Sequence, residues 1–361
     1  TLSRMSATPQ PGTALDRDVF AQLDPTDQLT DVLAIPEHLR DALWKAESAN
    51  VEPWDSTGGL IVAGMGGSGI GGRIARGILG DQASRPVLSV HEYALPPWTT
   101  GDVTVLCTSY AGDPEETLAC FEAAGVLGAR RIVATTGGAL AAAARAENVP
   151  VIPIAGGLQP RAAVAYQVVA ALEAAWLCGA GPRLTTDIDV AADHLEQLVA
   201  AWGPDAGDES EAKALARALQ DTVPVILGSG LTSNIAYRWK TQLNENAKQL
   251  AFDGSLPEID HNEIVGWSSA ERHGRFSAVF LDDCDDTPRV AQRIRLTREI
   301  IGDHASGTHV VPSRGQTRFE RAFSLILLGD LVSLYLAALN GEDPVTIDAI
   351  DRLKGALAET E

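Results

Sequence analysis

The stretch Gly59-Leu-Ile-Val-Ala63, followed by Gly64-Met-Gly-Gly-Ser-Gly69, decides the fold class of this chain. A short, continuously apolar run leads into a turn rich in glycine, and an amphipathic helix is expected to follow. The same pattern returns at Val223-Pro-Val-Ile-Leu227 and Gly228-Ser-Gly230. A strand, a tight turn and a helix are the repeating unit of α/β proteins, so the sequence predicts two related α/β units.

Further strands and helices alternate after each of these two segments. Strands are predicted at 86–90, 103–107, 131–134, 149–154, 277–281 and 308–311, and helices at 114–124, 139–146, 232–250 and 287–301. Apolar strands that alternate with helices indicate parallel sheets covered on both faces. We therefore expect an α/β fold of two doubly wound parallel-sheet domains, each with three α/β/α layers.

The predicted domain limits follow from composition. We expect an N-terminal extension with a helix over residues 1–50, a first domain over 51–182, a helical linker over 183–222 and a second domain over 223–361. The linker prediction rests on helical patterns at 187–202 and 211–220, which flank the Gly-, Pro- and acid-rich loop 203–209. Helices at 317–339 and 345–358 are expected to close the chain.

Composition excludes several classes of partner. The 361 residues include 28 Lys and Arg against 48 Asp and Glu, a formal net charge of −20. Such a field repels nucleic acid and anionic membranes, so neither is expected as a partner. An anionic ligand must therefore be held by a local pocket of N–H groups, hydroxyls and arginine.

Cysteine usage and hydropathy predict a soluble cytoplasmic protein. Cys107, Cys120, Cys178 and Cys284 lie far apart, without the spacing of a metal site, and are expected to be reduced thiols. Residues 1–16 lack the apolar core of a secretory signal. The apolar stretch 323–339 is interrupted by glycine and aspartate and is expected to be too short to span a bilayer.

The first glycine-rich turn allows three interpretations. Its spacing, Gly64-x-Gly66-x-x-Gly69, matches the dinucleotide fingerprint, with Glu92 as a candidate ribose-binding acid. Alternatively, Gly66, Gly67 and Ser68 hold a single phosphate at a helix N-terminus. The glycines also suit a turn with no ligand. A P-loop is excluded because no Walker lysine follows.

A second loop favours the phosphate interpretation. Thr108-Ser109-Tyr-Ala-Gly112-Asp-Pro114 follows the next strand and precedes a helix expected to start at Pro114. Two such turns at neighbouring strand ends converge on one anion at the carboxyl edge of a parallel sheet. A dehydrogenase does not require this second loop, so a phosphate monoester is favoured over a dinucleotide.

The two loops resemble those of a sugar isomerase (SIS) domain. Four further segments resemble the bifunctional phosphoglucose/phosphomannose isomerase family: Gly157–Arg161, Lys240–Lys248, Leu256–Ile264 and Leu353-Lys354. The resemblance extends from about residue 58 to residue 354, nearly the whole chain. The Asn-Glu-Asn-Ala-Lys and His-Asn-Glu-Ile blocks are specific, whereas the glycine loop is not.

The resemblance implies two SIS domains in a homodimer with shared active sites, a phosphosugar substrate, and neither metal nor cofactor. Glu245 matches the catalytic base, and His261 the ring-opening histidine supplied by the neighbouring subunit. Arg161 matches the arginine beside the reacting carbons, and Lys354 the C-terminal lysine. Ser68 and Ser109 match phosphate-binding hydroxyls.

These residue types suit aldose–ketose isomerisation. A carboxylate can move a proton between C1 and C2, a histidine titrates near neutrality, and cations stabilise an enediolate. Glucose 6-phosphate or mannose 6-phosphate would give fructose 6-phosphate through one shared enediolate. By pattern alone, however, Glu245 and Lys354 resemble solvated helix residues, and His261 resembles an ordinary loop histidine.

The second loop departs from the family pattern Ser-Tyr-Ser-Gly-Asn-Thr. Ala111, Asp113 and Pro114 replace a serine, an asparagine and a threonine, which removes two hydroxyl donors and a backbone N–H. A carboxylate is also expected near the anion. The alternative function is therefore a catalytically weak protein that senses sugar phosphates or nucleotide sugars.

Two other features are expected to be structural. Residues 282–286 (Asp-Asp-Cys-Asp-Asp) lack the spacing of a calcium loop and are predicted to form an acidic surface loop. His273 is expected to have a structural role.

Overall fold

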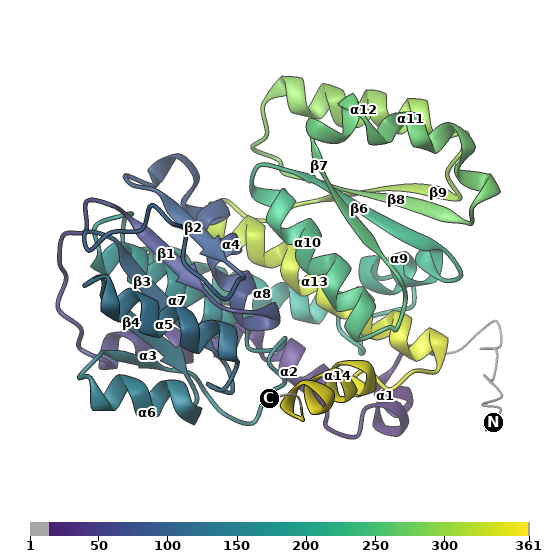
Figure 1. Cartoon of the computed structure of the whole chain (residues 1–361). Coiled ribbons are helices and arrows are strands. Elements are labelled where there is room, and N and C mark those ends of the chain that lie inside the picture. The colour runs from purple at the N-terminus through teal and green to yellow at the C-terminus, as the bar shows by residue number, and fades with distance from the viewer. Residues whose placement is uncertain (1–13, 360–361) are drawn as a thin grey trace.

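Two parallel sheets with helices on both faces form the protein (Figure 1). The computed structural model describes residues 14–359, so most of the N-terminal segment considered as a secretory signal lies outside the described residues. The strands of the first sheet are β1 (Leu60–Ala63), β2 (Val87–Val90), β3 (Thr104–Ser109), β4 (Arg130–Thr135) and β5 (Val151–Pro153). The strands of the second sheet are β6 (Val223–Ser229), β7 (Phe252–Leu256), β8 (Phe276–Asp282) and β9 (Gly307–Pro312).

Both sheets are wound in the same way. The strand order is β2-β1-β3-β4-β5 in the first sheet and β7-β6-β8-β9 in the second, and every pairing is parallel. In each sheet the winding reverses beside the first strand, β1 or β6. The expected α/β fold is confirmed, and the carboxyl edge at the reversal is where such sheets hold ligands.

The helices agree with the sequence patterns, with a few corrections. The bounds are α1 (Arg17–Leu23), α2 (Gln28–Leu33), α3 (Ile35–Ser48), α4 (Gly66–Leu79), α5 (Glu115–Val126), α6 (Gly138–Ala146), α7 (Val164–Leu177), α8 (Thr185–Trp202), α9 (Glu211–Leu219), α10 (Leu231–Glu245), α11 (Glu263–Gly266), α12 (Pro288–Ile301), α13 (Arg318–Asn340) and α14 (Asp348–Ala358). The prediction that one helix runs from 232 to 250 was wrong. It ends at Glu245 and an unpredicted strand, β7, follows. The sequence of β7, Phe-Asp-Gly-Ser-Leu, has no continuous apolar run to reveal it.

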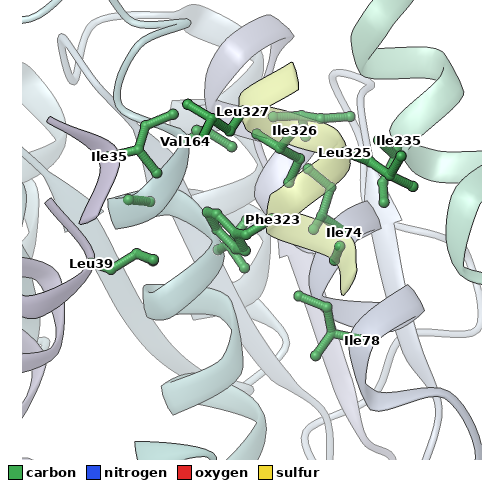
Figure 2. Packing of buried hydrophobic residues seen from close by; sticks show 14 of the residues in the cluster. Ile35, Leu39, Ile74, Ile78, Val164, Ile235, Phe323, Leu325, Ile326 and Leu327 are labelled. Carbon is green, nitrogen blue, oxygen red and sulfur yellow. The ribbon is translucent and has the colours of Figure 1, made fainter. Parts of the chain in front are cut away.

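Helix α13 is the centre of the molecule. Its residues 319–339 are all buried, and it packs chiefly against α8, α9 and α10, with α2 and α4 also in contact. Figure 2 shows Ile35 of α3, Ile74 of α4, Val164 of α7 and Ile235 of α10 in the same hydrophobic cluster as the α13 side chains Phe323 and Leu325–Leu327. One hydrophobic cluster thus joins the inner faces of both sheets, while α5 and α6 cover the outer face of the first sheet and α12 that of the second.

The length of α13 corrects one sequence prediction. At 23 residues, α13 is long and apolar enough to cross a membrane. The sequence prediction considered only the stretch 323–339 and was therefore wrong about length. The most apolar window of α13 is, however, wholly buried within the protein, as in the core helix of a globular fold. The interruption by Asp330 is explained by an ion pair, because Arg238 Nη2 lies 2.6 Å from an Asp330 carboxylate oxygen.

Helices α8 and α9, the predicted linker, pack on α13 as part of the common core. Ala191, Ala192, Leu195 and Leu219 are fully buried there. The exact domain limits stay a prediction. The four cysteines are unpaired, three of them buried and Cys284 exposed, as the sequence indicated.

Candidate active site

The first glycine-rich turn forms the N-terminus of α4 at the carboxyl end of β1. Gly66 has a left-handed φ of 50°, which favours glycine. A Cβ on Gly67 would lie 3.0 Å from the backbone of Pro160 and Arg161, so glycine allows this turn to touch the 157–161 loop. The backbone N–H groups of Gly66 and Gly67, at the start of α4, have no partner within the helix and are available to an anion.

The second loop lies directly beside the first. The backbone N–H of Tyr110 donates to Ser68 Oγ over 2.9 Å, and that of Gly112 donates to Ser109 Oγ over 3.0 Å. Each serine hydroxyl accepts a main-chain proton and can still donate its own. The Tyr110 hydroxyl in turn accepts from Leu158 N over 2.7 Å, which ties the second loop to the 157–161 loop. The expected convergence of two turns on one edge is confirmed.

The altered residues of the second loop have a different arrangement from that expected. Asp113 Oδ1 accepts the backbone N–H of Ala139 over 3.0 Å and caps α6, which follows the neighbouring strand β4. Its charge therefore faces a helix N-terminus rather than standing unpaired at the anion site. Pro114 is the residue before α5, which begins at Glu115, so the predicted start at Pro114 was one residue early.

A histidine that the sequence analysis passed over supports the first turn. Arg73 Nε donates to His91 Nε2 over 2.9 Å, and His91 Nδ1 therefore carries the proton that bonds to Gly64 O over 2.7 Å. Burial lowers the pKa of His91, and Arg73 lowers it further, which favours this neutral form.

The predicted base and the predicted arginine meet. Arg161 Nη1 lies 3.6 Å from Glu245 Oε2, where the end of α10 approaches the 157–161 loop. The Arg161 side chain is 3% exposed and that of Glu245 is 28% exposed, so the carboxylate retains access to solvent. Burial lowers the pKa of Arg161, and the Glu245 carboxylate opposes that shift.

Four acceptors hold the rest of the Arg161 guanidinium. Nε donates to Asn246 Oδ1 over 2.7 Å. Nη2 donates to Gln28 Oε1 over 3.1 Å and to the carbonyls of Pro344 and Val345 over 2.6 and 3.1 Å. The remaining nitrogen, Nη1, is the one beside Glu245.

A pocket of about 360 Å³ opens at Glu245. The end of α10 and the start of α14 line it, together with Lys248. Lys248 Nζ donates to Glu245 O over 2.9 Å and also to the carbonyl of Asp343, so it joins α10 to the segment that precedes α14. The volume is within the usual range for a small-molecule site.

The other two predicted catalytic residues lie apart from this pair. Lys354 is exposed on α14, one turn beyond Ile350, which lines the pocket. His261 is exposed in the short 3₁₀ helix Glu258–His261 that follows β7. Within one chain, therefore, the structure brings together Glu245 and Arg161 but not His261.

The path of α10 shows why His261 is distant. Lys240 pairs with Asp253 at 2.9 Å, and Ser233 lies 2.5 Å from Ser255, so α10 and β7 run side by side in opposite directions. Glu245 lies about 18 Å further along α10 than Ser233. His261 follows the opposite end of β7, beyond Ser255.

The second Gly-Ser turn is occupied by the acidic loop. Asp286 accepts a hydrogen bond from Ser229 Oγ over 2.9 Å beside the N-terminus of α10. Asp283 is 4% exposed and pairs with Arg321 at 2.8 Å, whereas Cys284 and Asp285 are exposed, so the predicted surface loop lies only partly at the surface. No metal-binding cluster of His, Cys, Asp or Glu occurs within residues 14–359.

Two residues that hold Arg161 were missed or only partly indicated by the sequence. Asn246 belongs to the Asn-Glu-Asn-Ala-Lys block, so its position was marked although its role was not. Gln28 lies in the predicted extension and had no motif around it. Only the fold shows that α2 reaches the arginine.

Comparisons with known proteins identify relatives over nearly the whole chain. Residues 208–357 match the model of the bacterial phospho-glucose isomerase C-terminal SIS domain. A bifunctional phosphoglucose/phosphomannose isomerase of Caldicellulosiruptor bescii is 38% identical, over 91% of this chain and 98% of the relative. One of Aquifex aeolicus is 32% identical, over 87% and 94%.

Solved structures share the fold at low identity. A hypothetical protein from Thermus thermophilus has a TM-score of 0.74 and 15% identity, over 96% of this chain and 93% of that one. A putative phosphosugar isomerase from Silicibacter pomeroyi has a TM-score of 0.66 and 18% identity, over 88% and 99%. On the near-complete coverage of its relatives, the chain belongs to the bifunctional phosphoglucose/phosphomannose isomerase family.

Proposed function

We propose that this chain interconverts glucose 6-phosphate or mannose 6-phosphate with fructose 6-phosphate. The observation that carries the proposal is the pairing of Glu245 with Arg161 at 3.6 Å beside an open pocket. Relatives that share nearly the whole chain are named for these two activities. They favour an isomerase over a sensing protein, and over a dehydrogenase.

Glu245 takes the proton in this proposal. Its carboxylate removes the C2 proton of the open-chain aldose and delivers it to C1, and the O2 hydroxyl proton passes to O1 through water, which leaves the ketose. Only one proton moves between neighbouring carbons, so a single partly exposed carboxylate suffices. Because C2 becomes planar in the enediolate, the glucose and mannose epimers share that intermediate.

Arg161 stabilises the charge that develops on the sugar oxygens. Its guanidinium is 3% exposed and held by hydrogen bonds on Nε and Nη2, so it does not reorganise when the enediolate forms. A fixed cation in a buried setting stabilises a developing anion more than a solvated one. Lys354, one turn from the pocket, is proposed as a second cation.

The phosphate belongs at the two converging turns. Ser68 and Ser109 supply hydroxyl donors, and the first amides of α4, including those of Gly66 and Gly67, complete the site. Arg161 follows Pro160, whose backbone touches Gly67, so the phosphate end and the reacting end of a hexose meet the same loop.

Ring opening requires His261 of a second copy of the chain. Within one chain, Glu245 lies at the end of α10 that is away from His261, and His261 is exposed. Phe252 and Val265 nearby expose 47% and 72% of their surface, as expected for a face covered by another subunit. The proposal therefore includes a homodimer with shared active sites. It also includes a cytoplasmic location, because free thiols are typical of a reducing compartment.

The test is a coupled assay of the purified chain. Fructose 6-phosphate is supplied with a metal chelator, and glucose 6-phosphate and mannose 6-phosphate are measured separately. Formation of both products with chelator present is the expected result. If the chain binds fructose 6-phosphate without any turnover, the isomerase proposal is wrong and the sensing function is supported.

A further inference from the structure

A buried glutamine from the N-terminal segment touches the active-site arginine. Gln28, the first residue of α2, has no solvent exposure. Its Oε1 accepts from Arg161 Nη2 over 3.1 Å, and its Nε2 donates to Asn246 Oδ1 over 3.0 Å. It therefore contacts both Arg161 and the residue that holds Arg161 Nε.

The hydrogen-bond directions are fixed by the neighbours. Asn246 Nδ2 donates to Ser333 Oγ over 2.9 Å, and the Ser333 hydroxyl donates to the carbonyl of Asp330 over 2.7 Å. Asn246 Oδ1 must therefore face Arg161 Nε and Gln28 Nε2, because both are donors. The amide of Gln28 then presents its oxygen to Arg161.

These bonds leave one guanidinium edge for the substrate. Nε and Nη2 of Arg161 are engaged by Asn246, Gln28 and two main-chain carbonyls, and Nη1 alone faces Glu245. A planar guanidinium held on one edge cannot rotate without breaking several bonds at once. Gln28 supplies the side-chain acceptor for Nη2, since the other two acceptors are carbonyls of the 344–345 segment.

We propose that Gln28 is a positioning residue for catalysis, which holds Arg161 with Nη1 directed at Glu245 and at the reacting carbons of the sugar. The catalytic consequence rests on the proposed isomerase function. Helix α2 is then part of the active site, although it precedes both sheets in the sequence. Small displacements of a charge-stabilising group slow catalysis, so a change at Gln28 should lower kcat. Phosphate binding at the α4 and α5 turns does not involve Gln28, so KM should change little.

The test compares Gln28→Met with Leu29→Ala in the full chain. Methionine keeps the volume of the side chain and removes both hydrogen bonds. Leu29, its neighbour in α2, is 2% exposed, so its truncation loosens the same helix without touching Arg161. Initial rates with fructose 6-phosphate give kcat and KM, and thermal unfolding gives Tm.

We expect Gln28→Met to lower kcat about tenfold while KM stays within about twofold of wild type. Leu29→Ala is expected to lower Tm and leave kcat within about twofold. An unchanged kcat in Gln28→Met, or an equal loss in Leu29→Ala, overturns the positioning role. If Gln28→Met does not fold, Gln28→Asn is used with the same expectation, because its amide is one methylene too short to reach both partners.

A crystal structure of the glutamine variant separates this inference from the proposed function. A displaced Arg161 guanidinium supports positioning even if the wild-type chain shows no isomerase activity. An Arg161 that keeps its bond to Asn246 and its place beside Glu245 overturns it. Absence of activity in wild type alone counts against the proposed function only.

Discussion

Arg161 and Glu245 approach to 3.6 Å although they belong to different halves of the chain. Arg161 follows the last strand of the first sheet, and Glu245 ends the helix that follows the first strand of the second sheet. The pair therefore exists only when the two halves are packed against each other, through α4, α10 and α13. This relationship makes the common core a requirement for the site as well as for stability.

Replacement of the arginine by another cation tests the pair. Arg161→Lys keeps one positive charge but cannot donate to Asn246, Gln28 and Pro344 while also facing Glu245. We expect kcat to fall about a hundredfold, as when a charge-stabilising donor is removed. Steady-state kinetics measure this loss. A lysine variant with kcat near wild type would show that a delocalised, fixed guanidinium is not needed.

The second loop offers a gain-of-function test. Ala111→Ser with Pro114→Thr restores two hydroxyls and one backbone N–H, and threonine is a good residue before α5. If the inherited phosphate site is weakened, glucose 6-phosphate affinity should rise at least tenfold, about 1.4 kcal/mol. Calorimetric titration measures it. No gain would favour a loop reshaped for another ligand, such as an unphosphorylated or larger sugar.

Asp113→Asn serves as the matched control in that titration. The structure changes what we expect of it, because Asp113 caps α6 through Ala139 N. Asparagine retains the accepting oxygen, so affinity should stay within about twofold of wild type. A large gain would mean that the carboxylate faces the phosphate after all.

Asp31, in α2, makes the free energy of unfolding depend on pH. Burial, and then the neighbouring carboxylates of Asp27 and Asp24, together raise the pKa of Asp31 in α2 from its ordinary 3.8 to about 6. The folded state therefore binds this proton more tightly than the unfolded chain. It follows that folding is penalised above pH 6 and that the penalty disappears as the pH falls from 6 towards 3.8.

Asp31→Asn removes this penalty. The variant should unfold at a higher Tm than wild type at pH 7, and the difference should shrink through the window from pH 6 to 3.8. Thermal unfolding at several pH values measures it. A constant difference across the window, or a lower Tm at pH 7, would contradict the assigned origin of the pKa shift.

Mixed dimers test the shared site. Glu245→Gln and His261→Ala homodimers are each expected to be inactive, but hybrids contain one site with an intact glutamate and an intact histidine. Mixing after mild dissociation should restore up to about half the wild-type activity per dimer in the hybrid fraction, because one of its two sites is intact. A fully active monomer at high dilution would show that His261 acts within its own chain or not at all.

Much of the fold could be predicted because apolar strands and glycine turns are local signals. The segments 60–63 and 223–229 are such strands, and the loops that follow them converge as expected. Strand β7 was missed because Asp253, Gly254 and Ser255 break its apolar pattern. Helix α7 was also missed. It is buried on nearly every side, so its sequence shows no helical alternation of apolar and polar residues.

The site could be predicted only where short motifs mark it. Glu245 and Asn246 stand in one block, and the structure confirms that Arg161 reaches them. Gln28 acts through a contact 133 positions away in the sequence, which no local pattern encodes. Asp113 was misjudged because its partner, the N-terminus of α6, belongs to a neighbouring strand's loop.

The most direct test of the central claim is exchange of the sugar proton with solvent deuterium in Glu245→Gln. Glu342→Gln is the control, because Glu342 lines the same pocket but does not pair with Arg161. Fructose 6-phosphate is incubated in D₂O, and deuterium at C1 and C2 is followed by NMR. We predict exchange in wild type and in Glu342→Gln and none above background in Glu245→Gln. Exchange at the wild-type rate in Glu245→Gln would contradict the assignment of Glu245 as the base.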